Sequence, residues 1–340
     1  MVLRRLSEAA GISGQEQEVR AIIRAELEGS VHRLEGDTIG NLIAVKNPGA
    51  PGPRVMLAAH MDEVGLMISG YERSGMLKFR KVGGIDDRVL VSKGVRIGKD
   101  RIPGVIGAKA IHLQEPKERE TPLRHDQLYI DIGAKSKEEA EKKVQLGEYA
   151  VFDTAYSEFG EGLVKGKALD DRIGCAVLIS LLKEDFNLPV YGCFTVQEEV
   201  GLRGAAVSAY RVNPQLGLAV EGTVCADVPG VDAEAQVTAL GRGPALTIAD
   251  AGTLPNRAML RELIRLARES NVPYQFRRTT VGATDAGRIH LAREGVPSAG
   301  IAVPCRYIHS PVSVASLEDF QNTVKLLTLF LRSVEGGFRP

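Results

Sequence analysis

The sequence lacks tryptophan altogether, and aromatic residues make up only 5% of its 340 positions. It also lacks a net charge, because 43 Lys and Arg residues balance 43 Asp and Glu residues. Proteins that bind nucleic acid or an anionic membrane surface ordinarily carry a basic excess, so we expect neither partner. The composition favours a partner that is small or neutral.

Long apolar runs and paired cysteines are missing as well. No window reaches 18 uncharged apolar residues, and the opening segment MVLRRLSEAAGISG has no apolar core of the kind that marks an export signal. The four cysteines form no C-x-x-C pair and lie among apolar neighbours, at Cys175, Cys193, Cys225 and Cys305. Isolated cysteines of this kind are typical of buried free thiols in a reducing compartment. We therefore expect a cytoplasmic protein with no membrane partner.

Apolar residues are plentiful, at 44%, and they fall into two kinds of segment. Continuous apolar runs, typical of strands covered on both faces of a sheet, occur at 55–59, 190–196, 216–220 and 298–303. Helical periodicity occurs between and around them, at 14–29, 171–184, 201–210, 255–270, 284–293 and 317–334. Strands that alternate with helices predict an α/β layered domain with a largely parallel sheet.

Residues 65–160 have a different character. They form a series of short β-like runs separated by glycine-rich breaks, with one predicted helix in SKEEAEKKVQ. Helix and strand alternate on both sides of this stretch, so we predict a small β-rich domain at 65–160 inserted into a larger domain formed by 1–64 and 161–340. Two serines each precede a glutamate by three residues, a capping-box pattern that predicts helix starts at Ser13 and Ser136.

Residues that can bind metal or transfer protons follow the apolar runs. The side chains that come after the ends of these predicted strands are His60, Glu198, Glu199, Glu221 and His309. Open α/β sheets place their ligand sites at the carboxyl ends of strands, so we expect these groups to meet. Asp170 and Asp171 stand at the start of an apolar helix as a further candidate pair. Histidine and carboxylate ligands without a thiolate suit an open, catalytic site for Zn²⁺, Co²⁺ or Mn²⁺.

Each candidate also has an ordinary structural explanation. Asp170 and Asp171 could cap a helix, and the adjacent glutamates could be the solvated first turn of the helix near 201. Single histidines are often structural, and we assign that role to the four others, His32, His112, His125 and His290. None of these explanations accounts for the shared position after strands, so the set as a whole favours a functional site.

Six motifs resemble a known family. They are AAHMDEVG at 58–65, KALDDRIG at 167–174, TVQEEVGLRGA at 195–205, the acidic residue at 221, GATDAG at 282–287 and RYIHSP at 306–311. In this order they resemble the dinuclear metallo-aminopeptidases that include tetrahedral, glutamyl and deblocking aminopeptidases, related to the co-catalytic zinc exopeptidases. The resemblance spans essentially the whole chain. It implies a three-layer sandwich with a mostly parallel central sheet and an inserted domain resembling a small β-barrel.

The resemblance also implies roles for individual residues. One divalent metal ion would be held by His60, Asp170 and Glu221, and a second by Asp170, Glu199 and His309, with zinc or cobalt expected and manganese as an alternative. Asp62 would hold the imidazole of His60 through its other ring nitrogen, and the peptide bond after Asp170 would be cis. Many members have aspartate where this chain has Glu221, so metal preference at that position could differ.

The implied reaction is removal of the N-terminal residue of a peptide. Two metals sharing a water lower its pKa and polarise the scissile carbonyl, and Glu198 would act as general base. We predict that Thr284 and Asp285, in GATDAG, contribute to substrate binding. Relatives assemble through the inserted domain, often to a dodecamer and also to dimers, so we expect a homo-oligomer.

Three alternatives remain open at the level of sequence. A deacylase or amidase could use the same dinuclear scaffold, and some relatives have carried a glycoside-hydrolase label. A glycosidase would use paired carboxylates without needing two histidines and a bridging aspartate. A non-catalytic peptide-binding scaffold is the third alternative, and the presence of Glu198 beside a full ligand set speaks against it.

Overall fold

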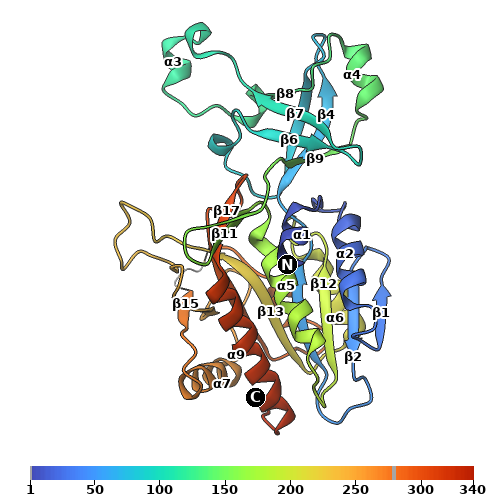
Figure 1. Cartoon of the computed structure of the whole chain (residues 1–340), viewed down its shortest axis with the longest axis vertical. Coiled ribbons are helices and arrows are strands. Elements are labelled where there is room, and N and C mark those ends of the chain that lie inside the picture. The colour runs from blue at the N-terminus through green and yellow to red at the C-terminus, as the bar shows by residue number, and fades with distance from the viewer. Residues whose placement is uncertain (1, 278–280) are drawn as a thin grey trace.

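The structure of the chain is a computed structural model that describes residues 2–277 and 281–340. It has a large α/β unit built on an 11-stranded sheet and a smaller unit built on a closed six-stranded barrel. The barrel occupies the upper part of Figure 1 and the sheet with its helices the lower part. The predicted α/β fold with a barrel-like insert is confirmed.

The centre of the large sheet is parallel. Its four central strands, in spatial order, are β12 (Val190–Thr195), β3 (Val55–His60), β13 (Leu216–Val224) and β16 (Ser298–Arg306). Antiparallel strands extend both sides: β1 (Arg33–Gly36) and β2 (Leu42–Lys46) on one, β17 (Ser313–Ser316), β11 (Leu163–Gly166) and β10 (Ser157–Phe159) on the other. A branch of β14 (Ala245–Thr247) and β15 (Gln275–Arg277) joins at β16. The parallel prediction therefore holds for the centre, whereas the sheet as a whole is mixed.

Alternation along the buried strands gives the sheet two apolar faces. In β3, Val55, Leu57 and Ala59 enter the main core, while Met56 and Ala58 enter a second core on the opposite face. The main core is completed by helices α1 (Val2–Glu8), α2 (Gln17–Leu27), α5 (Leu169–Lys183), α7 (Arg257–Glu269) and α9 (Leu317–Glu335). The second core is completed by α6 (Arg203–Val212) and α8 (Ala286–Ile289). This gives the three layers that were expected.

The barrel has its own apolar core. Its strands are β4 (Gly65–Tyr71), β5 (Leu77–Val82), β6 (Gly94–Ile97), β7 (Ile102–Gly107), β8 (Tyr129–Asp131) and β9 (Tyr149–Phe152). The barrel unit also contains short helices, namely α3 (Pro116–Arg119), α4 (Lys137–Lys143), η1 (Asp87–Val89), η2 (Ile111–Leu113) and η3 (His125–Gln127). The predicted cap at Ser136 is confirmed, because its side chain accepts from the amide of Glu139.

Three local predictions are wrong. Ser13 does not cap α2: its hydroxyl donates to Asp62 at 2.6 Å, and the helix begins only at Gln17. The helix predicted at 284–293 is the single turn α8. β13 continues past its apolar run to Val224, because its last residues pair with β16, so Glu221 lies inside the strand rather than after it.

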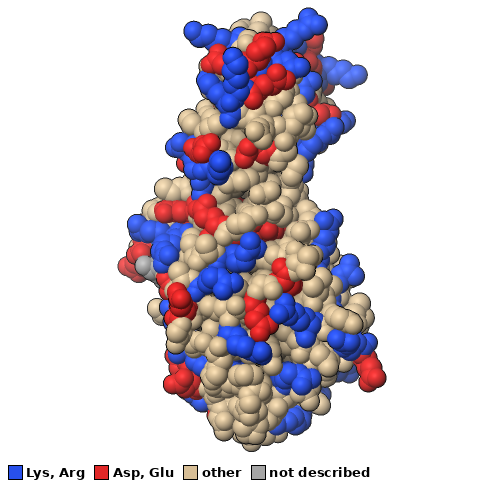
Figure 2. Space-filling model, turned by 90° about the vertical axis from the view of Figure 1, so that its right-hand side faces the viewer, with Lys and Arg blue, Asp and Glu red and all other residues tan. Residues whose placement is uncertain are grey.

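The surface carries charges of both signs. Figure 2 shows Lys and Arg interspersed with Asp and Glu over the face it displays, with no region of one sign. Among the described residues, no helix is long and apolar enough to cross a membrane. The four cysteines are free and buried, as predicted.

Candidate metal centre

The carboxyl edge of the central sheet brings the predicted ligand residues together. His60 is the last residue of β3, Glu221 lies in β13, and His309 follows β16. Glu199 follows β12, and Asp170 comes from the start of α5, which packs against β3 and β13. None of the groupings of possible metal ligands among the described residues includes any of the other four histidines.

Asp170 stands between the two histidines. Its Oδ1 lies 3.5 Å from Nε2 of His60, and its Oδ2 lies 3.3 Å from Nε2 of His309. The carboxylate therefore offers one oxygen to each imidazole. The peptide bond between Asp170 and Asp171 is cis, as the resemblance implies.

Each histidine has a second carboxylate nearby. Nε2 of His60 lies 3.5 Å from Oε2 of Glu221, and Nε2 of His309 lies 3.5 Å from Oε1 of Glu199. Potential ligand atoms of Asp170, Glu199 and His309 all lie within 4.8 Å of one another. The other two groupings within that limit both contain His60, one with Glu198 and Glu199 and one with Asp171 and Glu221.

Asp171 also lies near His60 and Glu221, within the same 4.8 Å limit. However, its two oxygens already accept backbone amides, from His60 at 3.1 Å and from Gly174 at 3.0 Å. Asp171 is therefore engaged in holding the end of β3 against α5, which leaves Asp170 as the carboxylate that faces both histidines.

The second ring nitrogen of each histidine is fixed by a carbonyl oxygen. Nδ1 of His60 lies 3.0 Å from the backbone oxygen of Asp62, and Nδ1 of His309 lies 2.9 Å from that of Gly84, which belongs to the barrel unit. A proton on each Nδ1 leaves Nε2 with a free lone pair toward the carboxylates, the tautomer that binds metal. The Asp62 carboxylate was expected to make this contact, but it lies farther from Nδ1, at 3.5 Å.

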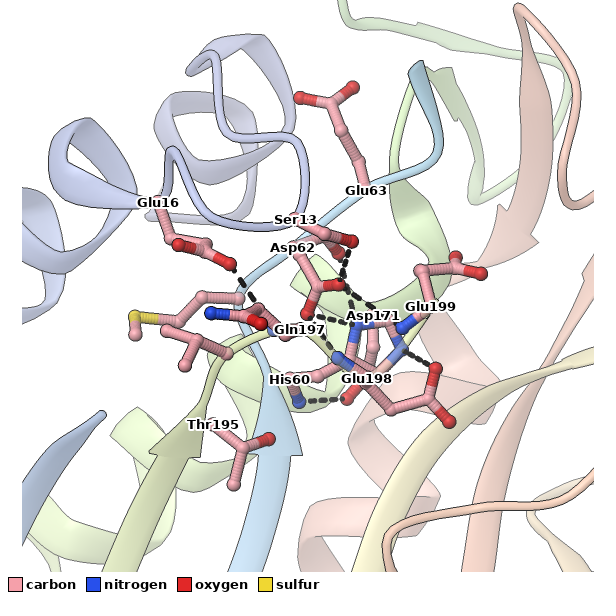
Figure 3. Close-up of polar contacts among 12 residues, drawn as sticks. Ser13, Glu16, His60, Asp62, Glu63, Asp171, Thr195, Gln197, Glu198 and Glu199 are labelled. Atoms are coloured by element: carbon pink, nitrogen blue, oxygen red, sulfur yellow. Dashed lines mark hydrogen bonds and ion pairs between the residues drawn. The ribbon is translucent and has the colours of Figure 1, made fainter. Parts of the chain in front are cut away.

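The carboxylate of Asp62 instead organises the turn after β12. It accepts the backbone amides of Glu198 at 3.0 Å and Glu199 at 3.1 Å, and the hydroxyl of Ser13 (Figure 3). Glu198 then lines the larger cavity beside His60, with Oε2 at 3.8 Å from Nε2, whereas Glu199 lines a smaller space beside His309. The two adjacent glutamates therefore face different parts of the centre.

Burial of so many acids perturbs their titration. Burial raises the pKa of Glu198 and Glu221 well above the ordinary value, and it raises that of Glu199 to about 7. Burial also opposes ionisation of Asp170, but hydrogen bonds to His309 and His60 outweigh it and lower the pKa of Asp170. For His309 burial acts to lower the pKa, yet the contact with Asp170 raises it to about 9.

This donor set fits divalent cations. Four carboxylates and two imidazoles converge in a space where their side chains are mostly buried, listed by residue as His60, Asp170, Glu198, Glu199, Glu221 and His309. Buried carboxylates are costly unless positive charge compensates them, and oxygen and imidazole ligands without thiolate suit zinc, cobalt or manganese. The residues present can therefore hold metal in two adjacent positions.

A cavity of about 250 Å³ opens beside the centre. Its wall includes Thr284, one of the two residues predicted to bind substrate, and Arg277 at the end of β15. Asp285 is fully buried, and its carboxylate accepts from Thr195 at 2.5 Å instead of lining the cavity. Arg277 could not be identified from the sequence, because the segment QFR has no feature that distinguishes it from other short strands.

The chain is similar to known proteins over nearly its whole length. The family model described as M42 glutamyl aminopeptidase matches residues 40–326. The FrvX protein of Escherichia coli (strain K12) is 38% identical over 339 residues, which cover 98% of this chain and 95% of that protein.

Solved structures are similar over the same extent. The TET aminopeptidase from the marine sediment archaeon Thaumarchaeota archaeon SCGC AB-539-E09 superposes with a TM-score of 0.94 and 36% identity, covering 98% of this chain and 97% of that one. The Pyrococcus horikoshii TET1 peptidase, described as assembling into a tetrahedron or a large octahedral shell, gives a TM-score of 0.85 and 34% identity, covering 96% and 97%.

Proposed function

Because this chain belongs to the M42 glutamyl aminopeptidase family, and so removes N-terminal residues from peptides, we propose how its residues carry out that reaction. Two divalent metal ions, zinc or cobalt before manganese, are held in adjacent positions. The ligands are His60, Asp170 and Glu221 for one ion and Asp170, Glu199 and His309 for the other. Family membership favours this activity over the deacylase, glycosidase and scaffold alternatives.

The observation that carries the proposal is the position of Asp170 between two imidazoles. Its two oxygens face Nε2 of His60 and Nε2 of His309 at 3.5 and 3.3 Å. A glycosidase needs two carboxylates and no such arrangement, whereas a carboxylate that offers one oxygen to each of two histidines is suited to bridge two adjacent ions.

When bound, such ions lower the pKa of a water and polarise the scissile carbonyl. Glu198 is the general base: it lines the cavity beside the ligands, and its Oε2 lies 3.8 Å from Nε2 of His60, farther than the carboxylate oxygens of Asp170 and Glu221 at 3.5 Å. Burial raises the pKa of Glu198, which suits a group that takes a proton from the attacking water and passes it to the leaving amine. Thr284 lies on the cavity wall and contacts the substrate, while Asp285 supports that wall from behind through Thr195.

The decisive experiment separates the base from a ligand. We expect Glu198→Gln to keep the metal content of the wild-type protein and to lose turnover of an aminoacyl-anilide by about 100-fold or more, because general-base catalysis contributes roughly 10²–10⁴-fold. His309→Ala should instead lower the metal content, because it removes one of three ligands at one position. Metal analysis and steady-state kinetics on both variants check this.

Two results would contradict the proposal. Near wild-type turnover by Glu198→Gln would remove the base assignment, and two ions per chain in His309→Ala would remove that ligand. Chelation provides the control for the whole centre: hydrolysis should stop with a chelator and return with Co²⁺ or Zn²⁺, whereas a metal-independent hydrolase would be unaffected.

We also propose a homo-oligomer in the reducing cytoplasm. The assembly is supported by the tetrahedral and octahedral shells described for the Pyrococcus horikoshii relative, with a dimer as the smaller alternative. The location is supported by the four free, buried thiols.

A further inference from the structure

The turn that carries Glu198 and Glu199 is held by side chains. β12 ends at Thr195, and each of the next four amide N–H groups donates to a side-chain oxygen from a distant part of the chain. The amide of Val196 donates to Asn41 at 2.9 Å. The other three pairs, shown in Figure 3, are Gln197 to Glu16 at 3.2 Å, Glu198 to Asp62 at 3.0 Å and Glu199 to Asp62 at 3.1 Å. The position of the base therefore depends on these acceptors.

Glu16 is the unexpected member of this set. It occupies the N-cap position of α2, yet its side chain caps no amide of that helix. One carboxylate oxygen instead accepts from Gly14 at 2.6 Å and from Gln197 across 181 residues of sequence. A side chain at the N-cap ordinarily stabilises its own helix by accepting one of the first amides, whereas Glu16 reaches the turn after β12 instead.

The environment of Glu16 is costly for an acid. The residue is only 2% exposed, and among residues 2–277 and 281–340 no cation forms an ion pair with it. Burial, with the nearby charge of Asp62 as a smaller contribution, raises the pKa of Glu16 to about 7. A buried acid without a cationic partner lowers stability, and such groups concentrate at functional sites.

The residue that Glu16 contacts needs support. Gln197 has φ of +58°, a left-handed backbone conformation that costs a side-chain-bearing residue free energy. It directly precedes Glu198, so its conformation sets the direction in which the base leaves the turn. The bond from the Gln197 amide to Glu16 holds the peptide that enters this strained residue, directly before Glu198.

We propose that Glu16 is a positioning residue for the aminopeptidase reaction, holding the Gln197 amide so that Glu198 is aimed at the cavity. It acts through the turn and contacts no ligand of the metal centre. This inference rests on the proposed function of Glu198 as general base.

Three substitutions of Glu16 test the acceptor. Glu16→Met keeps the length without an acceptor oxygen, and Glu16→Asp keeps the charge, favours the N-cap, and is too short by one methylene. We expect both to lower kcat by about tenfold or more at unchanged KM and metal content, because small misplacements of catalytic groups cost up to about 100-fold. Glu16→Gln, whose amide oxygen can still accept, should stay within about threefold of wild type.

The matched control is Glu18→Ala on the same helix. Glu18 is exposed and pairs with Arg101 at 2.8 Å, away from the turn, so its removal should leave kcat unchanged. Combining Glu16→Asp with Glu198→Gln gives a second readout. If Glu16 acts only through the base, the double variant should turn over substrate as slowly as Glu198→Gln alone, whereas a general structural effect would slow it further.

The outcomes separate this inference from the function on which it rests. If Glu198→Gln is inactive but Glu16→Asp keeps wild-type kcat, the positioning role is wrong and the base assignment stands. If Glu198→Gln is active, both fail. Loss of metal or a changed KM alone in the Glu16 variants would also overturn the positioning role. If Glu16→Met does not fold, Glu16→Asp alone still tests the role. Aspartate is favoured at an N-cap, so we expect that variant to fold.

Discussion

At the scale of single residues, the two adjacent glutamates divide their roles because the chain leaves strand geometry before it reaches them. Gln197 turns the backbone into a left-handed conformation after β12, and Asp62 then holds the next two amides. Glu198 faces the larger cavity and Glu199 faces His309. Neighbouring acids on an extended strand would instead point to opposite faces of the sheet.

Arg277 provides a prediction about substrate preference. It is largely buried in the cavity wall, its guanidinium lies 3.6 Å from Asp250, and its Nε has no hydrogen-bond partner within the described part of the chain. Its Nη2 also donates to the backbone oxygen of Val281 at 2.9 Å. The guanidinium places a positive charge in the cavity wall, which favours an acidic side chain on the N-terminal residue. We expect Arg277→Met to lower kcat/KM for a glutamyl-anilide by about tenfold or more relative to a leucyl-anilide, since a charge-assisted bond contributes roughly 1.5–3 kcal/mol.

The control for this prediction is Arg265→Met, which removes an exposed arginine on α7 that does not line the cavity. It should leave the ratio of the two substrates unchanged. An unchanged ratio in Arg277→Met as well would show that this arginine does not select the substrate, and that its role is to hold Asp250.

The residues with recognisable chemistry could be predicted, and their supports could not. His60, Asp170 and His309 stood out because strand ends and acidic pairs are visible in the sequence. Asn41 did not, and Glu16 was noticed only as part of a predicted capping box, because their bonds to the turn join residues more than 150 positions apart. No local pattern encodes a contact of that separation.

At the scale of elements, continuous apolar runs located the central strands because these strands are covered on both faces. The errors occur where a tertiary contact competes with a local signal. Ser13 is diverted from α2 by Asp62, and β13 is prolonged beyond its apolar run by pairing with β16. The antiparallel direction of the edge strands could not be predicted, because an apolar pattern in the sequence does not encode which way a strand pairs.

A buried ion cluster fixes the elements behind the site. Lys167 Nζ and Arg172 Nη2 lie 2.7 and 3.1 Å from Oε1 of Glu63, and all three side chains are buried. Arg172 also donates to backbone oxygens of Leu6, Ala9, Gly11 and Met61. The cluster therefore ties α1 and the segment after it to the end of β3 and to α5.

We expect Glu63→Gln to destabilise the protein by about 3 kcal/mol, because removing one partner of a buried ion pair leaves uncompensated charge. Guanidinium unfolding at a fixed protein concentration measures the change. The matched control is Glu139→Gln on α4, which breaks an exposed pair with Lys143 and should cost about 0.5 kcal/mol or less. Equal midpoints for the two variants would show that the buried cluster contributes no more than a surface pair.

At the scale of the whole molecule, the barrel and the sheet unit meet at the metal centre. The backbone oxygen of Gly84, in the segment between β5 and η1, orients His309, which comes 225 residues later in the chain. The barrel is thus part of the support of a proposed ligand, His309, as well as a separate unit with its own core. A change that displaces the barrel should therefore also displace the imidazole of His309, because this contact links the two.

The barrel carries exposed apolar side chains that suit an interface between copies of the chain. Ile111 and Leu113 lie on η2 with 69% and 62% of their surface exposed in the single chain, where an interface between copies would bury them. Light scattering should give a mass well above the 36.6 kDa of one chain, with about 440 kDa expected for twelve chains. Replacing both residues with Asp should lower that mass, because unpaired charges would be buried on assembly.

Leu291→Asp is the matched control, because Leu291 is similarly exposed, at 65%, but belongs to the sheet unit. If assembly runs through the barrel, this variant should keep the wild-type mass while Ile111→Asp with Leu113→Asp does not. If Leu291→Asp lowers the mass and the double barrel variant does not, the interface lies on the sheet unit. Activity on a short peptide should persist in the smaller species, since the proposed ligands and base all come from one chain.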